Sequence, residues 1–142
     1  MNCLPGRIAA IETCGSIALV DVDAVGLKLT ATLVGAGALT DCWRPGMAVT
    51  LLFAETEVAL AKNLSGLISM RNRLPGRIVA LERGTVLTKV TLDIAGQRVV
   101  SVITTRSSHT LALQEGEPVE ALVKANEMGV MPAASLVPGE RG

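Results

Sequence analysis

Aromatic side chains are almost absent from this chain of 142 residues, which has one tryptophan, one phenylalanine and no tyrosine. Proteins that bind single-stranded nucleic acid without sequence preference stack bases on aromatic side chains beside a basic groove. The formal net charge is zero, so a long-range positive field is missing as well. These absences argue against a nucleic-acid-binding module, and the charge balance gives no attraction to an acidic membrane surface.

Cysteines are few, and their pattern is uninformative for chemistry. Cys3, Cys14 and Cys42 show neither an even count nor the CxxC spacing of a disulfide framework or a zinc site. We interpret them as reduced thiols. The N-terminus lacks a charged-then-apolar signal sequence, and the apolar stretch 33–39 is too short to cross a bilayer. The sequence therefore predicts a soluble cytoplasmic protein with no membrane partner.

No catalytic set is recognisable. The only histidine, His109, has no serine, cysteine or acid at a spacing that would make a triad, and we interpret it as a helix residue facing solvent or an interface. The phosphate-binding motifs GxxxxGK[ST] and GxGxxG are absent despite 14 glycines. We therefore expect no enzymatic activity, no cofactor and no directly ligated metal ion.

What the chain does contain is an internal repeat. Residues 2–8, Asn-Cys-Leu-Pro-Gly-Arg-Ile, return as Asn-Arg-Leu-Pro-Gly-Arg-Ile at 72–78, and the same offset continues without gaps as far as Leu60 over Val130. A fixed period defines one structural unit, and two copies predict a tandem pair of small domains. We place these domains at residues 1–66 and 67–136, followed by a flexible tail at 137–142.

Each copy has the pattern of an all-β fold with one short helix. A hydroxyl cluster at 105–108 is typical of a helix start, and Gly96-Gln97 of a tight turn between two strands. Three strands, a short helix and two strands predict a five-stranded Greek-key barrel of the OB type in each copy. The expected strands lie at 74–82, 85–95, 98–104, 118–124 and 128–131, and in the first copy at 7–12, 17–25, 27–33 and 49–53, with a loop or helix at 37–43 and a link at 61–70.

Hydrophobic residues make up 49% of the chain and charged residues 18%. Two domains this small cannot bury so many aliphatic side chains within one subunit. An apolar interface between copies, and therefore a homo-oligomer, is the natural expectation.

Three segments of the second copy carry a resemblance to a known family. Ser69-Met70-Arg71-Asn72, the stretch 101–107 and the stretch 121–125 resemble the Mop domain, the molybdate-binding unit of the molbindins, whose usual opening is Ser-Ala-Arg-Asn. Two such units in one short chain resemble the di-Mop cytoplasmic molbindins, the ModG type. The resemblance is strong over 69–131 and weaker over 1–61, where it depends on the repeat.

The resemblance implies a function and a site. It implies intracellular binding of molybdate, with tungstate as an analogue, for molybdenum storage and homeostasis. It also implies a homotrimer whose sites lie at domain and subunit interfaces, with Thr104 and Ser107 supplied by a neighbouring unit. The implied molybdate-binding residues are Ser69, Met70, Arg71, Asn72, Thr104, Ser107, Lys124 and Ala125.

The chemistry of these residues suits that ligand. Molybdate is a tetrahedral dianion that is fully deprotonated near neutral pH, so its site needs hydrogen-bond donors and positive charge. Arg71 and Lys124 supply charge, while Ser69, Thr104 and Ser107 supply hydroxyl groups. A lining of donors alone penalises hydrogen phosphate, whose O–H would find no acceptor, whereas the exclusion of sulfate must depend on cavity size.

The first copy departs from the pattern. Val34, Gly37 and Ala54 occupy the positions of the two hydroxyl residues and the lysine, and Met1 occupies that of Arg71. Its sites are therefore completed by second-copy residues and backbone N–H groups, or it is mainly a scaffold. For the family's second class of site, on a threefold axis, Lys28 and Arg98 are conceivable contributors.

Two other classes of function stay open at this stage. One is an OB-fold nucleic-acid-binding module, which the missing aromatics and basic groove disfavour. The other is a ligand-sensing regulatory module, since Mop pairs occur attached to DNA-binding or transporter ATPase domains. Within these 142 residues there is no room for either attachment.

Overall fold

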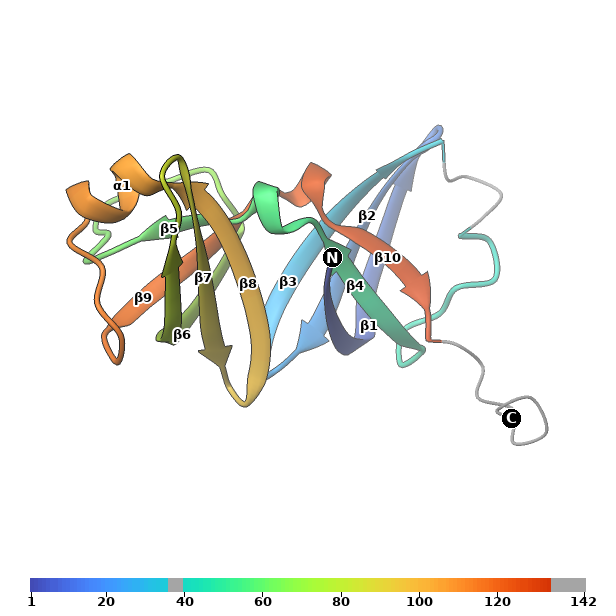
Figure 1. Ribbon diagram of the computed structural model, residues 1–142. Coiled ribbons are helices and arrows are strands. Elements are labelled where there is room, and N and C mark those ends of the chain that lie inside the picture. Colours follow the sequence, from blue (N-terminus) through green and yellow to red (C-terminus); the bar gives the residue numbers. More distant parts are fainter. Residues whose placement is uncertain (36–39, 134–142) are drawn as a thin grey trace.

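The computed structural model describes residues 1–35 and 40–133. The expected tail at 137–142 and part of the expected loop at 37–43 lie outside the described residues. Two curled five-stranded antiparallel sheets stand side by side, as Figure 1 shows. The predicted all-β architecture of two OB-type units is confirmed, but of the one short helix expected in each copy, the described residues show an α-helix in the second copy alone.

Ten strands and three short helices follow one another in the described chain. The first repeat forms β1 (Asn2–Cys14), β2 (Ile17–Ala24), β3 (Leu27–Val34), β4 (Ala48–Phe53), the 3-10 helix η1 (Glu55–Glu57) and β5 (Ala59–Ala61). The second forms β6 (Asn72–Arg83), β7 (Leu87–Ile94), β8 (Gln97–Thr104), α1 (Thr105–Thr110), β9 (Pro118–Val123), the 3-10 helix η2 (Ala125–Glu127) and β10 (Gly129–Pro132).

Alternation of apolar and polar residues explains the long hairpins. In β2 every second residue from Ala18 to Ala24 is buried, and β7 repeats the same pattern seventy positions later. Because successive side chains of a strand point to opposite faces, this period of two lines the core of each sheet. The hairpin turn lies at Ala95-Gly96, one residue before the predicted Gly96-Gln97, and both residues have positive φ (49° and 90°). Such angles belong to the type I′ turns that match strand twist.

The repeated Leu-Pro-Gly-Arg-Ile motif has a glycine at its centre because the neighbouring strand leaves no space for a side chain there. A Cβ on Gly76 would lie 2.5 Å from the backbone oxygen of Asp93, and one on Gly6 would lie 2.8 Å from that of Asp23. These glycines precede irregularities in the pairing of β6 with β7 and of β1 with β2. Glycine commonly marks such bulges, where two backbones approach closely. The motif is therefore a device of the fold.

The two sheets exchange their short last strands. The sheet of the first repeat has the order β10-β4-β1-β2-β3, and that of the second has β5-β9-β6-β7-β8. Thus β10 pairs with β4, with Val130 opposite Leu51, and β5 pairs with β9, with Leu60 opposite Ala121. Figure 1 shows β10 crossing to lie beside β4, and β5 lying beside β9. Each sheet is therefore completed by a strand of the other repeat. The domain boundary expected between residues 66 and 67 remains a prediction.

Some predicted limits change in the structure. The first strand begins at Asn2 rather than Arg7, because Asn2 to Arg7 pair with β4. The helix that starts at the hydroxyl cluster ends at Thr110, and Ala112, two residues further on, has a positive φ of 50°. Ala61 closes β5, which leaves 62–71 as the connector between the sheets.

A reciprocal pair of asparagines joins the two repeats. The side-chain oxygen of Asn72 accepts a bond of 2.7 Å from the backbone N–H of Thr30, and its amide nitrogen donates to the Thr30 carbonyl at 2.8 Å. Asn2 makes the equivalent two bonds, both 2.8 Å, with Val100. Each amide group thereby satisfies one backbone unit on the edge strand of the other sheet, in the manner of a strand partner.

Among the helices within residues 1–35 and 40–133, none has the length and apolarity needed to span a bilayer.

Candidate oxyanion-binding site

The first half of the candidate site is the start of α1. Thr104, in extended conformation, is the N-cap: its Oγ1 accepts a bond of 3.0 Å from the backbone N–H of Ser107 and donates to Ser107 Oγ at 2.8 Å. A hydroxyl N-cap of this kind stabilises a helix start. Both side chains are exposed. The prediction that the hydroxyl cluster begins a helix is confirmed, and two neighbouring hydroxyl groups face solvent there.

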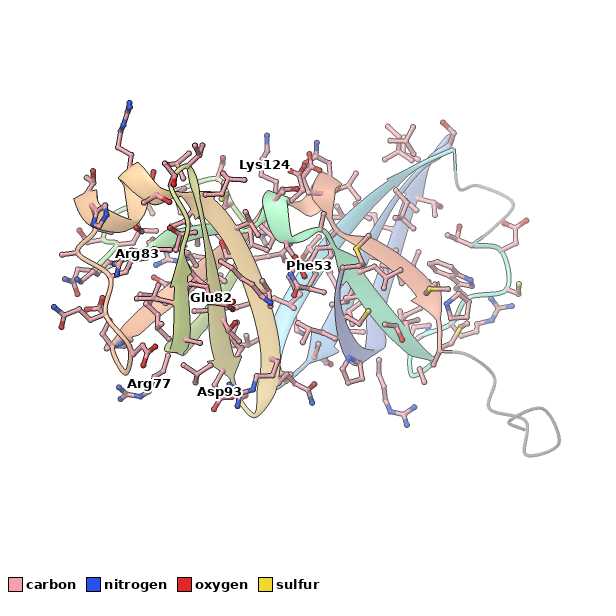
Figure 2. All side chains as sticks on the ribbon, in the orientation of Figure 1. Phe53, Arg77, Glu82, Arg83, Asp93 and Lys124 are labelled. Carbon is pink, nitrogen blue, oxygen red and sulfur yellow. The ribbon has the colours of Figure 1, made fainter. Side chains whose placement is uncertain are left out.

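Contacts to the preceding strands fix the position of α1. The Thr105 hydroxyl lies 2.8 Å from that of Thr88 and from the carbonyl oxygen of Gly84. Arg83, labelled in Figure 2, donates to Ser108 Oγ at 3.1 Å and to the Leu113 carbonyl at 2.8 Å. These bonds tie both ends of a helix of six residues to the barrel. The Thr104 and Ser107 hydroxyls are therefore held on a fixed support.

The second half comes from the connector and from β9. Met70 is half-buried, while Ser69 and Arg71 are exposed. Further back, the Lys62 ammonium group donates to the carbonyls of Leu111 and Ala112 at 2.8 and 3.2 Å and pairs with Glu117 at 3.0 Å. The connector is thereby fastened to the C-terminal end of α1, where a cation is favourable.

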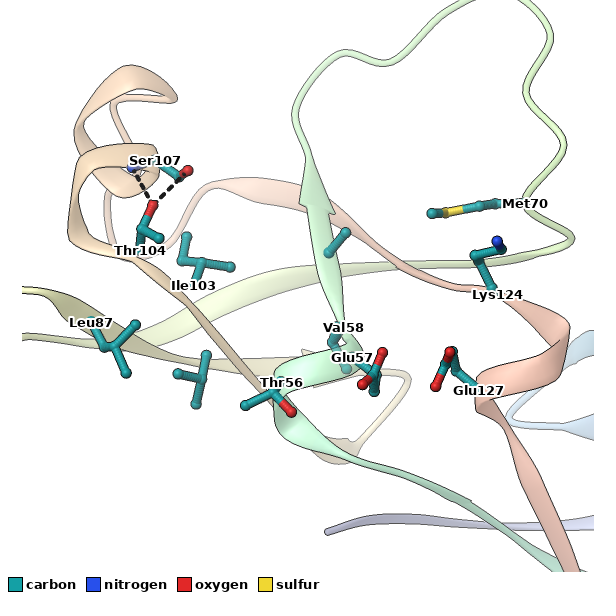
Figure 3. Close-up of a pocket in the computed structure, with 12 residues that line it drawn as sticks. Thr56, Glu57, Val58, Met70, Leu87, Ile103, Thr104, Ser107, Lys124 and Glu127 are labelled. Carbon is teal, nitrogen blue, oxygen red and sulfur yellow. Dashed lines mark hydrogen bonds between the residues drawn. The ribbon is translucent and has the colours of Figure 1, made fainter.

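A pocket of about 540 Å³ lies between these two halves. Figure 3 shows Thr104 and Ser107 at one end and Met70 and Lys124 at the other, with side chains of η1 between them. Lys124 is exposed and precedes η2, whose first residue is the half-buried Ala125. Four of the eight predicted site residues thus line one pocket.

The other four predicted residues lie elsewhere. Ser69, Arg71 and Ala125 are near in sequence to residues of the pocket but do not line it. Asn72 is fully buried, and both polar ends of its side chain bond to Thr30. The structure therefore places Asn72 at the junction of the repeats.

Sequence reasoning missed the first-repeat side of this pocket. Thr56, Glu57, Val58 and Ala59 line it because β5 pairs with the second sheet. No local signal in the sequence marks these residues, since their position follows from the strand exchange. His109, on exposed α1, does not line the pocket.

Charge is unevenly distributed in the pocket. In Figure 3, Glu127 lies at the same end as Lys124 and Glu57 lies toward the middle, whereas the hydroxyl groups lie apart from both carboxylates. Within the described residues Lys124 makes no ion pair, although two carboxylates share its pocket. One chain by itself thus presents two separated groups of donors, because its hydroxyls and its lysine do not converge.

Two acidic residues, Glu120 in β9 and Glu117 just before it, are each paired with a cation. The pKa of Glu117 is lowered mainly by a hydrogen bond from the Lys62 side chain, and to a smaller extent by one from the backbone N–H of Gln114. The bidentate pair with the Arg73 guanidinium, at 2.8 and 2.9 Å, lowers the pKa of Glu120. Each carboxylate is satisfied by its own cation, so neither competes for a ligand's donors. Across the described ranges, no group of three or more His, Cys, Asp or Glu side chains could hold a metal ion.

Comparison with known proteins identifies the class. Residues 68–130 match the TOBE domain family. Molybdenum-pterin-binding protein 2 of Clostridium pasteurianum is 37% identical over 65 residues, which cover 45% of this chain and 96% of that protein. The molybdenum import ATP-binding protein ModC of Brucella abortus is 39% identical over 80 residues, which are 22% of its length. The chain belongs to the family of the molybdenum-pterin-binding proteins, whose unit is the Mop domain.

A solved structure places the chain more narrowly within that family. It is similar to the cytoplasmic molybdate-binding protein ModG, solved with molybdate bound, with a TM-score of 0.87 and 27% identity. The match covers 93% of this chain and 96% of ModG, so both repeats and their arrangement are shared. The predicted resemblance to the two-domain molbindins is confirmed.

Proposed function

We propose that this protein binds molybdate reversibly in the cell and serves molybdenum storage and homeostasis. The observation that carries the proposal is the pocket lined by the hydrogen-bond donors Thr104, Ser107 and Lys124. The chain that forms this pocket matches molybdate-bound ModG over 93% of its length. Hydroxyl and ammonium groups donate hydrogen bonds to a dianion without requiring a proton from it. Binding makes and breaks no covalent bond, so the protein acts as a carrier and not as an enzyme.

The proposed site is shared between subunits. One subunit contributes Ser69, Arg71 and Lys124, and a neighbour contributes Thr104 and Ser107. The separation of these groups within one chain supports such sharing, because a small tetrahedral ion cannot contact both ends of a 540 Å³ pocket. Exposed apolar side chains beside α1 also favour an interface: Val86 is 71% exposed and Leu87 is 54% exposed. We propose a homotrimer.

Calorimetry on the purified chain tests this function. Titration with molybdate and tungstate should release or absorb heat with saturation, whereas phosphate at the same concentration should not. Absence of a signal with both metal oxyanions would refute the proposal. Native mass measurement with and without molybdate tests the trimer.

The site assignment is tested by Arg71→Ala. Loss of charge-assisted hydrogen bonds worth about 1.5–3 kcal/mol should weaken molybdate binding about 10- to 100-fold. The matched control is Lys89→Ala, which removes an exposed cation whose only ion pair in the described chain is a 3.8 Å contact with Glu82. Equal affinity of the Arg71 variant and the wild type would remove Arg71 from the site.

A further inference from the structure

The strand exchange creates two pockets that the repeat relates to each other. The second-repeat pocket, described above, places Val102–Thr104 beside Thr56–Ala59. The first-repeat pocket places residues 32–35 of β3 and the turn after it beside residues 126–130 of η2 and β10, and its volume is about 580 Å³. A shift of seventy positions converts 102–104 into 32–34 and 56–59 into 126–129. The two pockets are therefore equivalent in backbone and similar in size.

Their side chains differ where donors are needed. Val34 replaces Thr104 and is 78% exposed, so a hydrocarbon side chain points to solvent where the second repeat has a hydroxyl. Gly35 replaces Thr105 and has a φ of 75°. Ala54, the equivalent of Lys124, is half-buried. At the positions equivalent to Thr104 and Lys124, the first repeat therefore has no side chain that can donate to an anion.

The remaining polar groups of the first-repeat pocket supply no positive charge for an anion. Among the described residues that line it, Thr32 and Asn126 offer neutral donors, Glu127 offers a carboxylate, and none is a lysine or an arginine. A dianion placed there would lose its water and gain only neutral donors, without the cation that Lys124 supplies in the second-repeat pocket. Pocket size does not compensate, because the two volumes are nearly equal.

On the basis of the proposed function, we infer that the two repeats have divided their roles: the second repeat supplies the only complete side-chain donor set for molybdate. The first repeat completes the sheet of the second repeat through β5, and its η1 residues line one side of the second-repeat pocket. One donor set per chain completes one site per chain, whichever neighbour supplies each half. A trimer then holds three interface ions and not six.

The number of ions bound per chain tests this inference. Equilibrium dialysis of the full chain against molybdate, with molybdenum measured by mass spectrometry, should give fewer than two ions per chain at saturation. Lys124→Ala should reduce this number to less than one at a molybdate concentration that saturates the wild type. Val34→Ala, the control in the first-repeat pocket, should leave the number unchanged.

Specific results would overturn the inference. Two or more ions per wild-type chain would show that backbone groups complete the first-repeat site. One whole ion retained by Lys124→Ala, or one lost with Val34→Ala, would show the same. No molybdate bound to the wild type would instead refute the proposed function itself, which makes the two failures distinguishable.

Discussion

Asn72→Ala should separate a structural role from a ligand role for the most deeply buried residue of the Ser-Met-Arg-Asn segment. Asn72 is 0% exposed, and its partner Thr30 is 6% exposed. The substitution leaves the N–H and the carbonyl of Thr30 buried without the partner seen in the structure. Each unsatisfied group costs about 1–3 kcal/mol, so the free energy of unfolding should fall by about 2–6 kcal/mol.

The repeat provides a matched control. Asn2→Ala removes the same two bonds, but Val100 is only half-buried, so water can replace part of what is lost. At about 0.5–1.5 kcal/mol for each bond, the expected loss is about 1–3 kcal/mol. Asn72→Asp retains the acceptor for the Thr30 N–H but presents a carboxylate oxygen to the Thr30 carbonyl. It should therefore also destabilise the protein.

Urea unfolding at fixed protein concentration measures these losses, with fluorescence of Trp43, the only tryptophan and a buried one, as the signal. With a slope of about 2 kcal/mol per molar urea, the Asn72→Ala midpoint should fall by about 1–3 M. A loss below about 1 kcal/mol, or one smaller than that of Asn2→Ala, would refute the reasoning. The folded Asn72 variant should bind molybdate with unchanged affinity, and a tenfold weaker affinity at intact stability would make Asn72 a ligand.

Two further predictions concern packing and pH. Gly76→Ala should destabilise the protein by about 1–3 kcal/mol in the same urea assay, because the added Cβ would meet backbone atoms of Asp93. The control is Gly129→Ala, whose added Cβ would lie 3.7 Å from the nearest atom. Equal urea midpoints for the two variants would contradict the crowding argument. Because the pKa values of Glu117 and Glu120 are lowered in the folded protein, their ion pairs stabilise it above the ordinary carboxyl pKa of 4.5, and this stabilisation is lost as pH falls through the lowered values. The double variant Glu117→Gln/Glu120→Gln should therefore show a flatter decline of thermal midpoint below pH 4.5 than the wild type. An unchanged acid slope would assign that decline to other groups.

Much of the fold could be predicted from local patterns. The period of two in β2 and β7, a hairpin turn around Gly96 and the hydroxyl cluster ahead of α1 depend on neighbouring residues, so they can be recognised in the sequence. The motif residues of the second repeat could be found because the family segments around Ser69, Thr104 and Lys124 stand in the expected order. The chemistry of a donor-rich oxyanion site also follows from the residue types alone.

The amino-acid sequence by itself determined the repeat, the strands, the family and the loss of donors at Val34 and Ala54. Only the tertiary structure decided that β5 and β10 change places, since a short strand makes the same backbone hydrogen bonds in its own sheet or in the other one. That choice puts Thr56 and Glu57 into the pocket, sets the Thr104 and Lys124 groups apart within one chain and directs Asn72 to Thr30. Contacts between residues far apart in sequence govern these features, because local propensity does not distinguish two strand partners of equal length and chemistry.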